Sequence, residues 1–187
     1  MTMLANWSTP ILLGKITNKD AVDHTISHIL ENYDLVNPPS DLAGDNIFDD
    51  PGFDLFKTKI VIPAFNQWLK KTLNGKTLKD FDNPTFRGWL AGAHSGYQIK
   101  THNHSGSQVG AVFYLLNDQT ESGKIIFFDP RFNANRNYKT EMWGELFEPL
   151  TVDAVENTFV IFPSFVYHQT TNFTGNLRIA IPVDLFV

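Results

Sequence analysis

The sequence predicts a mainly β protein with flanking helices, in which a sandwich or jelly roll is braced by N-terminal helices. From about residue 85 onward, short apolar runs alternate with turn residues, as they do in antiparallel sheet proteins. Aromatic residues make up 13% of the chain and cluster in its second half, which favours a β-rich core. Its length of 187 residues predicts one domain over 1–187, with helical support at about 15–80 and the jelly-roll core at about 85–187.

Two helices are expected in the first part of the chain. A capping sequence at 17–20 starts the first helix, and the apolar residues that follow have helical spacing. The second helix covers much of 54–73, where Pro63 either kinks it or marks its start. His24 and His28 lie four residues apart on the first helix, as metal ligands can. We interpret them as part of a solvated face, because no third ligand is nearby in the sequence.

The second part of the chain contains the expected strands. Each is a short apolar run that ends in turn residues, a pattern typical of sandwiches and jelly rolls rather than of parallel α/β sheets. A long irregular insertion is expected at 129–157. The predicted strands cover 86–91, 109–116, 124–128, 158–162 and 177–187.

Composition and charge exclude several classes of protein. The net charge is −5 and the 15 basic residues are scattered, which argues against nucleic acid as a partner. Cysteine is absent, so disulfides, thiolate metal sites and a cysteine nucleophile are excluded. No apolar stretch is long enough to span a bilayer, and no charged leader or signal peptide is present. These features predict an intracellular, cytoplasmic protein without a membrane partner.

Three histidines form the strongest candidate for a functional site. His102 and His104 are two residues apart, so both side chains point the same way if this segment is extended. His168 follows the predicted strand 158–162, which can lie beside that segment in a jelly roll. Three ligands on one face of an octahedral ion leave three open positions. Non-haem Fe(II) oxygenases use such positions for a co-substrate and O₂, usually with two histidines and one carboxylate as ligands.

Arg178 is the second candidate feature, ten residues after His168. It lies in an otherwise apolar strand, so its side chain either leans into solvent or points inward to a buried anion. A carboxylate held by two parallel hydrogen bonds is a natural partner for a buried guanidinium. A His-x-His pair alone is common in loops, whereas the combination with His168 and Arg178 favours a metal site that also binds a dicarboxylate.

At these residues the chain resembles the superfamily of 2-oxoglutarate and Fe(II)-dependent oxygenases. The superfamily pattern is His-x-Asp, a distal histidine and an arginine about ten residues later, and the resemblance spans roughly 89–183. Segments 110–117, 122–131 and 162–164 resemble the strands and the turn that surround this pattern. The nearest branch is a small His-x-His group of putative 2OG-Fe(II) oxygenases found in bacteria and phages.

The resemblance implies a double-stranded β-helix fold and an iron site. His102 and His168 would be iron ligands. His104 stands where the superfamily usually has its carboxylate, which is the main departure from the pattern. Either His104 completes a three-histidine site, or it turns away and another group fills the third position.

The resemblance also implies that Arg178 holds the far carboxylate of 2-oxoglutarate. Tyr114 stands where a tyrosine hydroxyl often assists that arginine, although a core aromatic is the alternative. Ala180 replaces a common Ser or Thr, so one hydrogen bond to the co-substrate is expected to be missing. Candidates for contact with substrate near the expected mouth are His94, Tyr97, Gln98, Asn103, Gln108, Arg131, Trp143 and Gln169.

The implied activity is that of a 2-oxoglutarate-dependent dioxygenase, which hydroxylates a substrate and releases succinate and CO₂. Two alternatives stay open. The first is a three-histidine dioxygenase of the cupin type that does not use 2-oxoglutarate, and the second is a jelly-roll binding module without catalysis. A small molecule or a peptide is the expected substrate, while its identity and the oligomeric state cannot be read from the residues.

Overall fold

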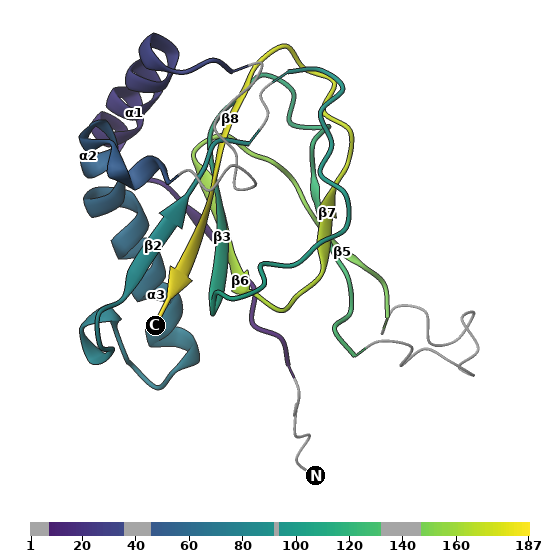
Figure 1. The fold of residues 1–187 in the computed structure, drawn as a ribbon. Coiled ribbons are helices and arrows are strands. Elements are labelled where there is room, and N and C mark those ends of the chain that lie inside the picture. Colours follow the sequence, from purple (N-terminus) through teal and green to yellow (C-terminus); the bar gives the residue numbers. More distant parts are fainter. Residues whose placement is uncertain (1–7, 36–45, 92–93, 132–146) are drawn as a thin grey trace.

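The computed structural model describes residues 8–35, 46–91, 94–131 and 147–187, and it consists of two facing antiparallel sheets with helices on one side (Figure 1). The larger sheet has the strand order β1-β6-β3-β8-β2, and the smaller sheet has the order β5-β4-β7. The predicted mainly β fold with flanking helices is therefore confirmed. The strands are β1 (Leu12–Lys15), β2 (Thr85–Gly88), β3 (Val109–Asn117), β4 (Ile125–Phe127), β5 (Leu150–Val152), β6 (Thr158–Pro163), β7 (His168–Thr170) and β8 (Arg178–Phe186).

Two helical segments cover the outer face of the larger sheet (Figure 1). Asn18 caps the first, α1 (Lys19–Asn32), by accepting a hydrogen bond from the backbone N–H of Ala21 at 3.0 Å. In the second, Pro63 lies just after a π-helical turn within a continuous helical segment, so it does not mark the start of this segment. No helix of the described ranges is long and apolar enough to cross a membrane. The second segment consists of α2 (Asp54–Phe56), a π-helical turn (Lys57–Val61) and α3 (Ile62–Thr72), and short 3₁₀ helices lie at Ile47–Asp49, Pro51–Phe53 and Leu78–Asp80.

Strand β3 separates two apolar clusters because its side chains alternate between its two faces. Phe113 lies in the cluster under the helices, where its ring is 5.4 Å from that of Phe56. Val112 and Tyr114 lie in the cluster between the two sheets, together with Phe127 of β4. Both faces of β3 are thus buried, which explains why its sequence is almost continuously apolar.

His28 ties α1 to the segment that follows it. Its Nε2 lies 2.7 Å from Oδ2 of Asp50, and the hydroxyl of Tyr33 donates to the same oxygen at 2.7 Å. His24 is exposed, as expected for a solvated helix face. The side chain of His28 is only 19% exposed, so the same expectation is wrong for His28. Neither histidine belongs to a cluster of three potential metal ligands among the described residues.

Three strands were not expected from the sequence. β1 precedes the first helix and pairs with β6, where Leu12 lies opposite Ile161. β5 lies inside the segment expected to be an irregular insertion, of which 132–146 are outside the described residues, and it pairs with β4. β7 begins at His168 itself. These strands have three or four residues each, too short for their periodicity to be recognised, and pairing with distant strands defines them.

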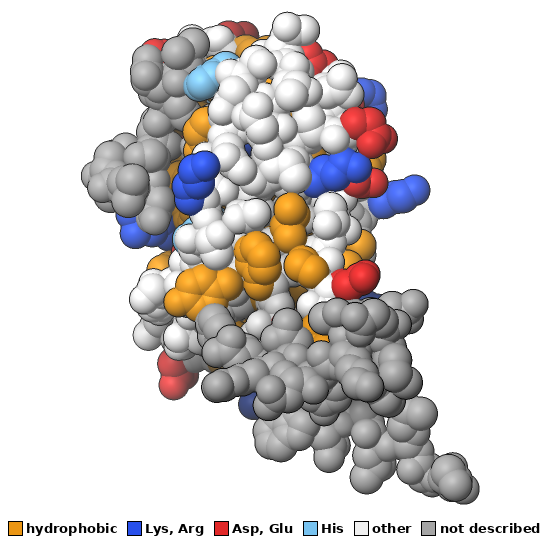
Figure 2. All heavy atoms as spheres, turned by 90° about the vertical axis from the view of Figure 1, so that its right-hand side faces the viewer, with side chains coloured by type: hydrophobic (Ala, Val, Ile, Leu, Met, Phe, Trp, Pro, Cys, Tyr) orange, Lys and Arg blue, Asp and Glu red, His pale blue; other side chains and the backbone are white. Residues whose placement is uncertain are grey.

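The smaller sheet has no helix on its outer face among the described elements. Figure 2 shows this face, on which apolar side chains gather beside scattered charged ones. Leu150 is 47% exposed, Phe165 is 56% exposed and Tyr167 is 37% exposed, and all three belong to this sheet or to the turn before β7. The helices therefore support only the larger sheet.

We expect the protein to unfold as one domain. The helices and the larger sheet share a single apolar cluster, which neither part can bury alone. Differential scanning calorimetry should show one cooperative transition for the full chain. Two separate transitions, one for the helical part and one for the sheets, would contradict a single domain.

Candidate active site

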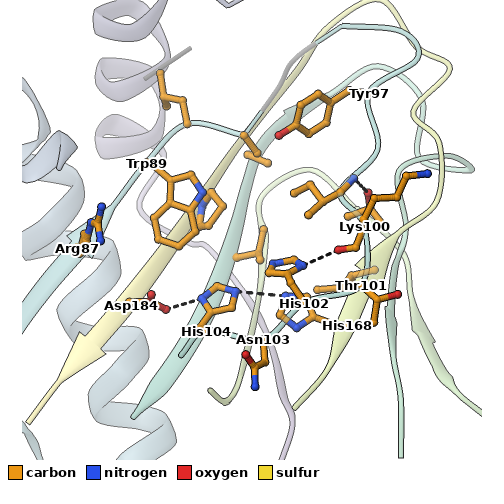
Figure 3. A pocket seen from close by; sticks show the side chains of 18 of the residues that line it. Arg87, Trp89, Tyr97, Lys100, Thr101, His102, Asn103, His104, His168 and Asp184 are labelled. Carbon is orange, nitrogen blue, oxygen red and sulfur yellow. Dashed lines mark hydrogen bonds and ion pairs between the residues drawn. The ribbon is translucent and has the colours of Figure 1, made fainter. Parts of the chain in front are cut away.

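The three predicted histidines meet in a cavity of about 710 Å³ between the two sheets. Figure 3 shows their rings pointing toward one another from the segment before β3 and from β7. Their potential ligand nitrogens all lie within 4.8 Å of one another, and Nε2 of His104 is 3.3 Å from Nε2 of His168. Residues 66 positions apart in the chain therefore form one cluster.

Backbone hydrogen bonds hold the two histidine segments side by side. His102 and His168 exchange both backbone hydrogen bonds, each at 2.9 Å, and form an isolated antiparallel bridge. The backbone N–H of His104 donates to the carbonyl of Ser164 at 3.0 Å. The segment at 102–104 therefore runs along β7 and the turn before it, and alternate residues of this segment present their rings to one point.

Each of the three rings has its Nδ1 directed at an oxygen atom. Nδ1 of His102 lies 2.8 Å from the carbonyl oxygen of Lys100, and Nδ1 of His168 lies 3.0 Å from that of Val166. A carbonyl oxygen can only accept, so these Nδ1 atoms carry the hydrogen, and the lone pair for a metal is then on Nε2. Nδ1 of His104 lies 2.5 Å from Oδ1 of the Asp184 carboxylate, with the same consequence for its Nε2.

His168 is held in its neutral form. Burial is the main cause that lowers its pKa to about 3, and charge repulsion from the neighbouring His104 and His102 contributes to the same shift. Its ring therefore carries no proton at Nε2 near neutral pH and can bind a cation. Three imidazole donors whose other nitrogens are already hydrogen-bonded fit a divalent transition metal such as iron.

Arg178 and Tyr114 line the same cavity as the histidines. Arg178 is only 2% exposed, so its side chain points inward, and its guanidinium carbon lies 5.0 Å from the ring centre of Phe173 and 5.9 Å from that of Tyr97. Burial lowers the pKa of Arg178, but an arginine stays protonated in proteins. Burial also raises the pKa of Tyr114 to about 12, so its hydroxyl remains a donor.

A glycine gives the guanidinium of Arg178 its space. Gly123 has a φ of +65°, and a Cβ built there would lie 2.2 Å from a terminal nitrogen of Arg178. Its carbonyl accepts a hydrogen bond from the same nitrogen at 3.3 Å. Gly123 thus positions Arg178 both by its missing side chain and by its backbone.

If Arg178 binds 2-oxoglutarate as the sequence predicts, Gly123→Ala should disturb this binding more than the fold. Gly75 provides a matched control, since its φ is +87° and no atom lies within 4 Å of a Cβ built there. Both alanine variants should lose about 1–2 kcal/mol of unfolding free energy, because alanine is disfavoured in the left-handed backbone conformation of these two positions. Only Gly123→Ala should weaken 2-oxoglutarate binding, by at least about tenfold, in anaerobic titrations of the Fe(II) protein. Equal binding by the two variants would show that Arg178 is not positioned by Gly123.

The remaining candidates near the mouth separate into two groups. Tyr97 and Asn103 line the cavity. Arg131 instead forms an ion pair with Asp129 outside it, and Trp143 is outside the described residues. The other four do not line the cavity: His94, Gln98, Gln108 and Gln169.

Sequence reasoning missed Asp184, which lines the cavity from β8. The missed signal was the alternation along this strand, because every second residue from Arg178 onward faces the cavity. Asp184 lies six residues after Arg178 in an otherwise apolar run and therefore shares its face. The cavity-lining residues of β8 are Arg178, Ala180, Pro182, Asp184 and Phe186, and other residues missed are Arg87, Trp89 and Lys100.

Comparison with known proteins decides the family. The sequence model of the family described as "Putative 2OG-Fe(II) oxygenase" matches residues 87–184, which is more than half of the chain and includes all three histidines and Arg178. The chain belongs to this family. The oxygenase is thus a 2-oxoglutarate-dependent dioxygenase with Fe(II) and 2-oxoglutarate as cofactors. No curated protein matches its sequence significantly.

Solved structures similar to this oxygenase share its fold at low sequence identity. A Pseudomonas putida prolyl-4-hydroxylase has 14% identity and a TM-score of 0.59, with 95% of this chain and 86% of that one covered. The viral collagen prolyl hydroxylase of Paramecium Bursaria Chlorella virus-1 has 10% identity and a TM-score of 0.58, with 95% and 96% covered. The epimerase SnoN from nogalamycin biosynthesis, in complex with Fe³⁺ and α-ketoglutarate, has 11% identity and a TM-score of 0.61, with 95% and 79% covered.

Proposed function

We propose that this oxygenase hydroxylates a small molecule or a peptide, with conversion of 2-oxoglutarate to succinate and CO₂. The observation that carries the proposal is the buried Arg178 in the same cavity as three convergent histidines. A metal site alone would suit many proteins. A metal site combined with a buried guanidinium suits a co-substrate that binds the metal at one end and carries a carboxylate at the other.

In this proposal, different residues of the cavity bind the iron and the far carboxylate of 2-oxoglutarate. His102, His104 and His168 would hold iron through Nε2, and the bound iron and 2-oxoglutarate together would supply the oxidising chemistry. Arg178 would bind the far carboxylate of 2-oxoglutarate, and the protonated hydroxyl of Tyr114 would donate a further hydrogen bond. Arg178 is 2% exposed and lies near the rings of Tyr97 and Phe173, so water would screen this ion pair only weakly.

The rest of the cavity has room and polarity for a second ligand. Arg87, Trp89 and Asn103 line it near His104 and Asp184 (Figure 3). Among the structural neighbours, a prolyl hydroxylase from Trichoplax adhaerens is in complex with a peptide fragment, with 14% identity, a TM-score of 0.59 and 94% and 83% of the chains covered. SnoN is described in complex with nogalamycin RO, a small molecule. We propose that a substrate of either kind enters near His104 and Asp184.

The test uses two measurements on purified protein. Under anaerobic conditions, adding 2-oxoglutarate to the Fe(II) protein should produce a visible charge-transfer absorption, because the co-substrate chelates the iron. After admission of O₂, succinate should form only when both Fe(II) and 2-oxoglutarate are present, and His168→Ala should abolish it. Iron binding without any effect of 2-oxoglutarate would favour the three-histidine dioxygenase, and the absence of iron binding would favour a module without catalysis.

A further inference from the structure

The carboxylate of Asp184 forms a hydrogen bond with the residue that stands at the position of a usual iron ligand in the superfamily pattern. His104 replaces that ligand, and Oδ1 of Asp184 lies 2.5 Å from its Nδ1. The side chains of His104 and Asp184 are 3% and 11% exposed, so this pair is shielded from bulk water. Figure 3 shows Asp184, His104 and His168 in a row, with the ring of His104 between the carboxylate and the other imidazole.

The fold holds this pair in place from several sides. Asp184 on β8 lies opposite Gly110 on β3. A Cβ built at Gly110 would lie 3.3 Å from Nδ1 of His104 and 3.0 Å from the ring of Phe162, so this glycine leaves space for the imidazole. The ring of Trp89 lies 5.6 Å from that of His104 on the cavity side. The geometry of the contact therefore depends on the packing of β3, β6 and β8, and both groups of the pair are buried.

We propose that Asp184 supplies, through the imidazole of His104, the negative charge that a directly bound carboxylate would otherwise bring to the iron. The inference rests on the proposed function, since it assigns a role toward bound metal. A carboxylate that accepts the Nδ1 hydrogen orients the ring and makes its Nε2 a better electron donor. Asp184 is thus a positioning residue that acts through His104. It also compensates for the positive charge that three neutral ligands would leave on the metal.

The first experiment compares two His–carboxylate pairs of this chain. Asp184→Asn removes the charge beside His104, and Asp50→Asn removes the charge beside His28, 2.7 Å from that ring and outside the cavity. By anaerobic calorimetry with Fe(II), Asp184→Asn should bind about 10–100-fold more weakly than wild type, whereas Asp50→Asn should bind normally. The Fe(III)/Fe(II) potential of Asp184→Asn should rise, because the more highly charged ion loses more stabilisation.

The outcomes separate this inference from the proposed function. Unchanged Fe(II) affinity and an unchanged potential in a folded Asp184→Asn protein would overturn the role of Asp184 and leave the iron site intact. A wild-type protein that does not bind Fe(II) would overturn the proposed function and the role of Asp184 with it. Thermal unfolding of each apo variant shows whether the fold is retained.

The second experiment distinguishes an effect through the imidazole from a structural one. The variant His104→Asp restores the usual His-x-Asp pattern and removes the ring through which Asp184 acts. In that background, Asp184→Asn should change Fe(II) affinity less than about threefold, so the two substitutions should be strongly non-additive. An equal loss in both backgrounds would mean that Asp184 only supports the fold, and the proposal would be wrong.

Discussion

Replacing Arg178 with alanine should weaken 2-oxoglutarate binding by well over tenfold and leave Fe(II) binding almost unchanged. The far carboxylate of the co-substrate must leave water for a largely apolar cavity, which is costly unless a fixed cation meets it. Arg178 is 2% exposed and its guanidinium lies near the rings of Phe173 and Tyr97, so its charge is poorly screened. Losing such a buried charge-assisted pair typically costs ~2–5 kcal/mol, and each ~1.4 kcal/mol is about tenfold in affinity.

Titration of 2-oxoglutarate into the anaerobic Fe(II) protein measures this effect. Arg178→Lys should restore binding only in part, because an ammonium group cannot form the two parallel hydrogen bonds of a guanidinium. Arg131→Ala is the matched control, since Arg131 pairs with Asp129 outside the cavity and should not affect the co-substrate. Equal affinities of wild type and Arg178→Ala would rule out this role and favour an oxygenase site that holds its co-substrate in another way.

Removing any one of the three histidines should weaken Fe(II) binding by more than about 100-fold, since even an outer partner of a metal ligand typically contributes 10–100-fold. His102→Ala, His104→Ala and His168→Ala each delete one of three nitrogens that lie within 4.8 Å of one another. In the folded chain the ring of His104 lies between the Asp184 carboxylate and His168, so Asp184 does not take the place of His102 or His168. Each variant leaves two of the three imidazole ligands, and we expect the three losses to be similar.

Anaerobic calorimetry with Fe(II) checks this expectation, and thermal unfolding of the apo proteins verifies their folding. His24→Ala is the control, because His24 is exposed on α1 and belongs to no cluster of potential ligands among the described residues. If His104→Ala bound Fe(II) like wild type while the other two variants did not, the three-histidine form of the site would be wrong. Asp184 would then have no ligand through which to act.

The local pattern of the sequence determined two long strands of the sheet that supports the site. The apolar runs at 109–116 and 158–162 became β3 and β6, because a strand buried on both faces needs an almost continuous apolar sequence. The spacing of His102 and His104 required only that this segment be extended for both rings to face one way. The charge of Arg178 in an apolar run left two orientations open, into solvent or inward, and its 2% exposure shows that it points inward.

Tertiary structure decided which distant segments pair and which of their side chains form hydrogen bonds. The pairing of β1 with β6 and of β5 with β4 is not encoded in the short strands themselves, since their stability comes from the neighbouring strand. In the same way, His104 and Asp184 are 80 residues apart, and the pairing of β8 with β3, together with the contacts of the 102–104 segment with β7 and the turn before it, brings the carboxylate to the ring. By itself, the sequence predicted which residues bind a metal and a carboxylate, and it determined the strand and the extended segment on which most of them lie. The contact that sets the charge of the metal site was decided by the packing of the sheets, because hydrogen bonds between distant residues depend on positions that no local pattern records.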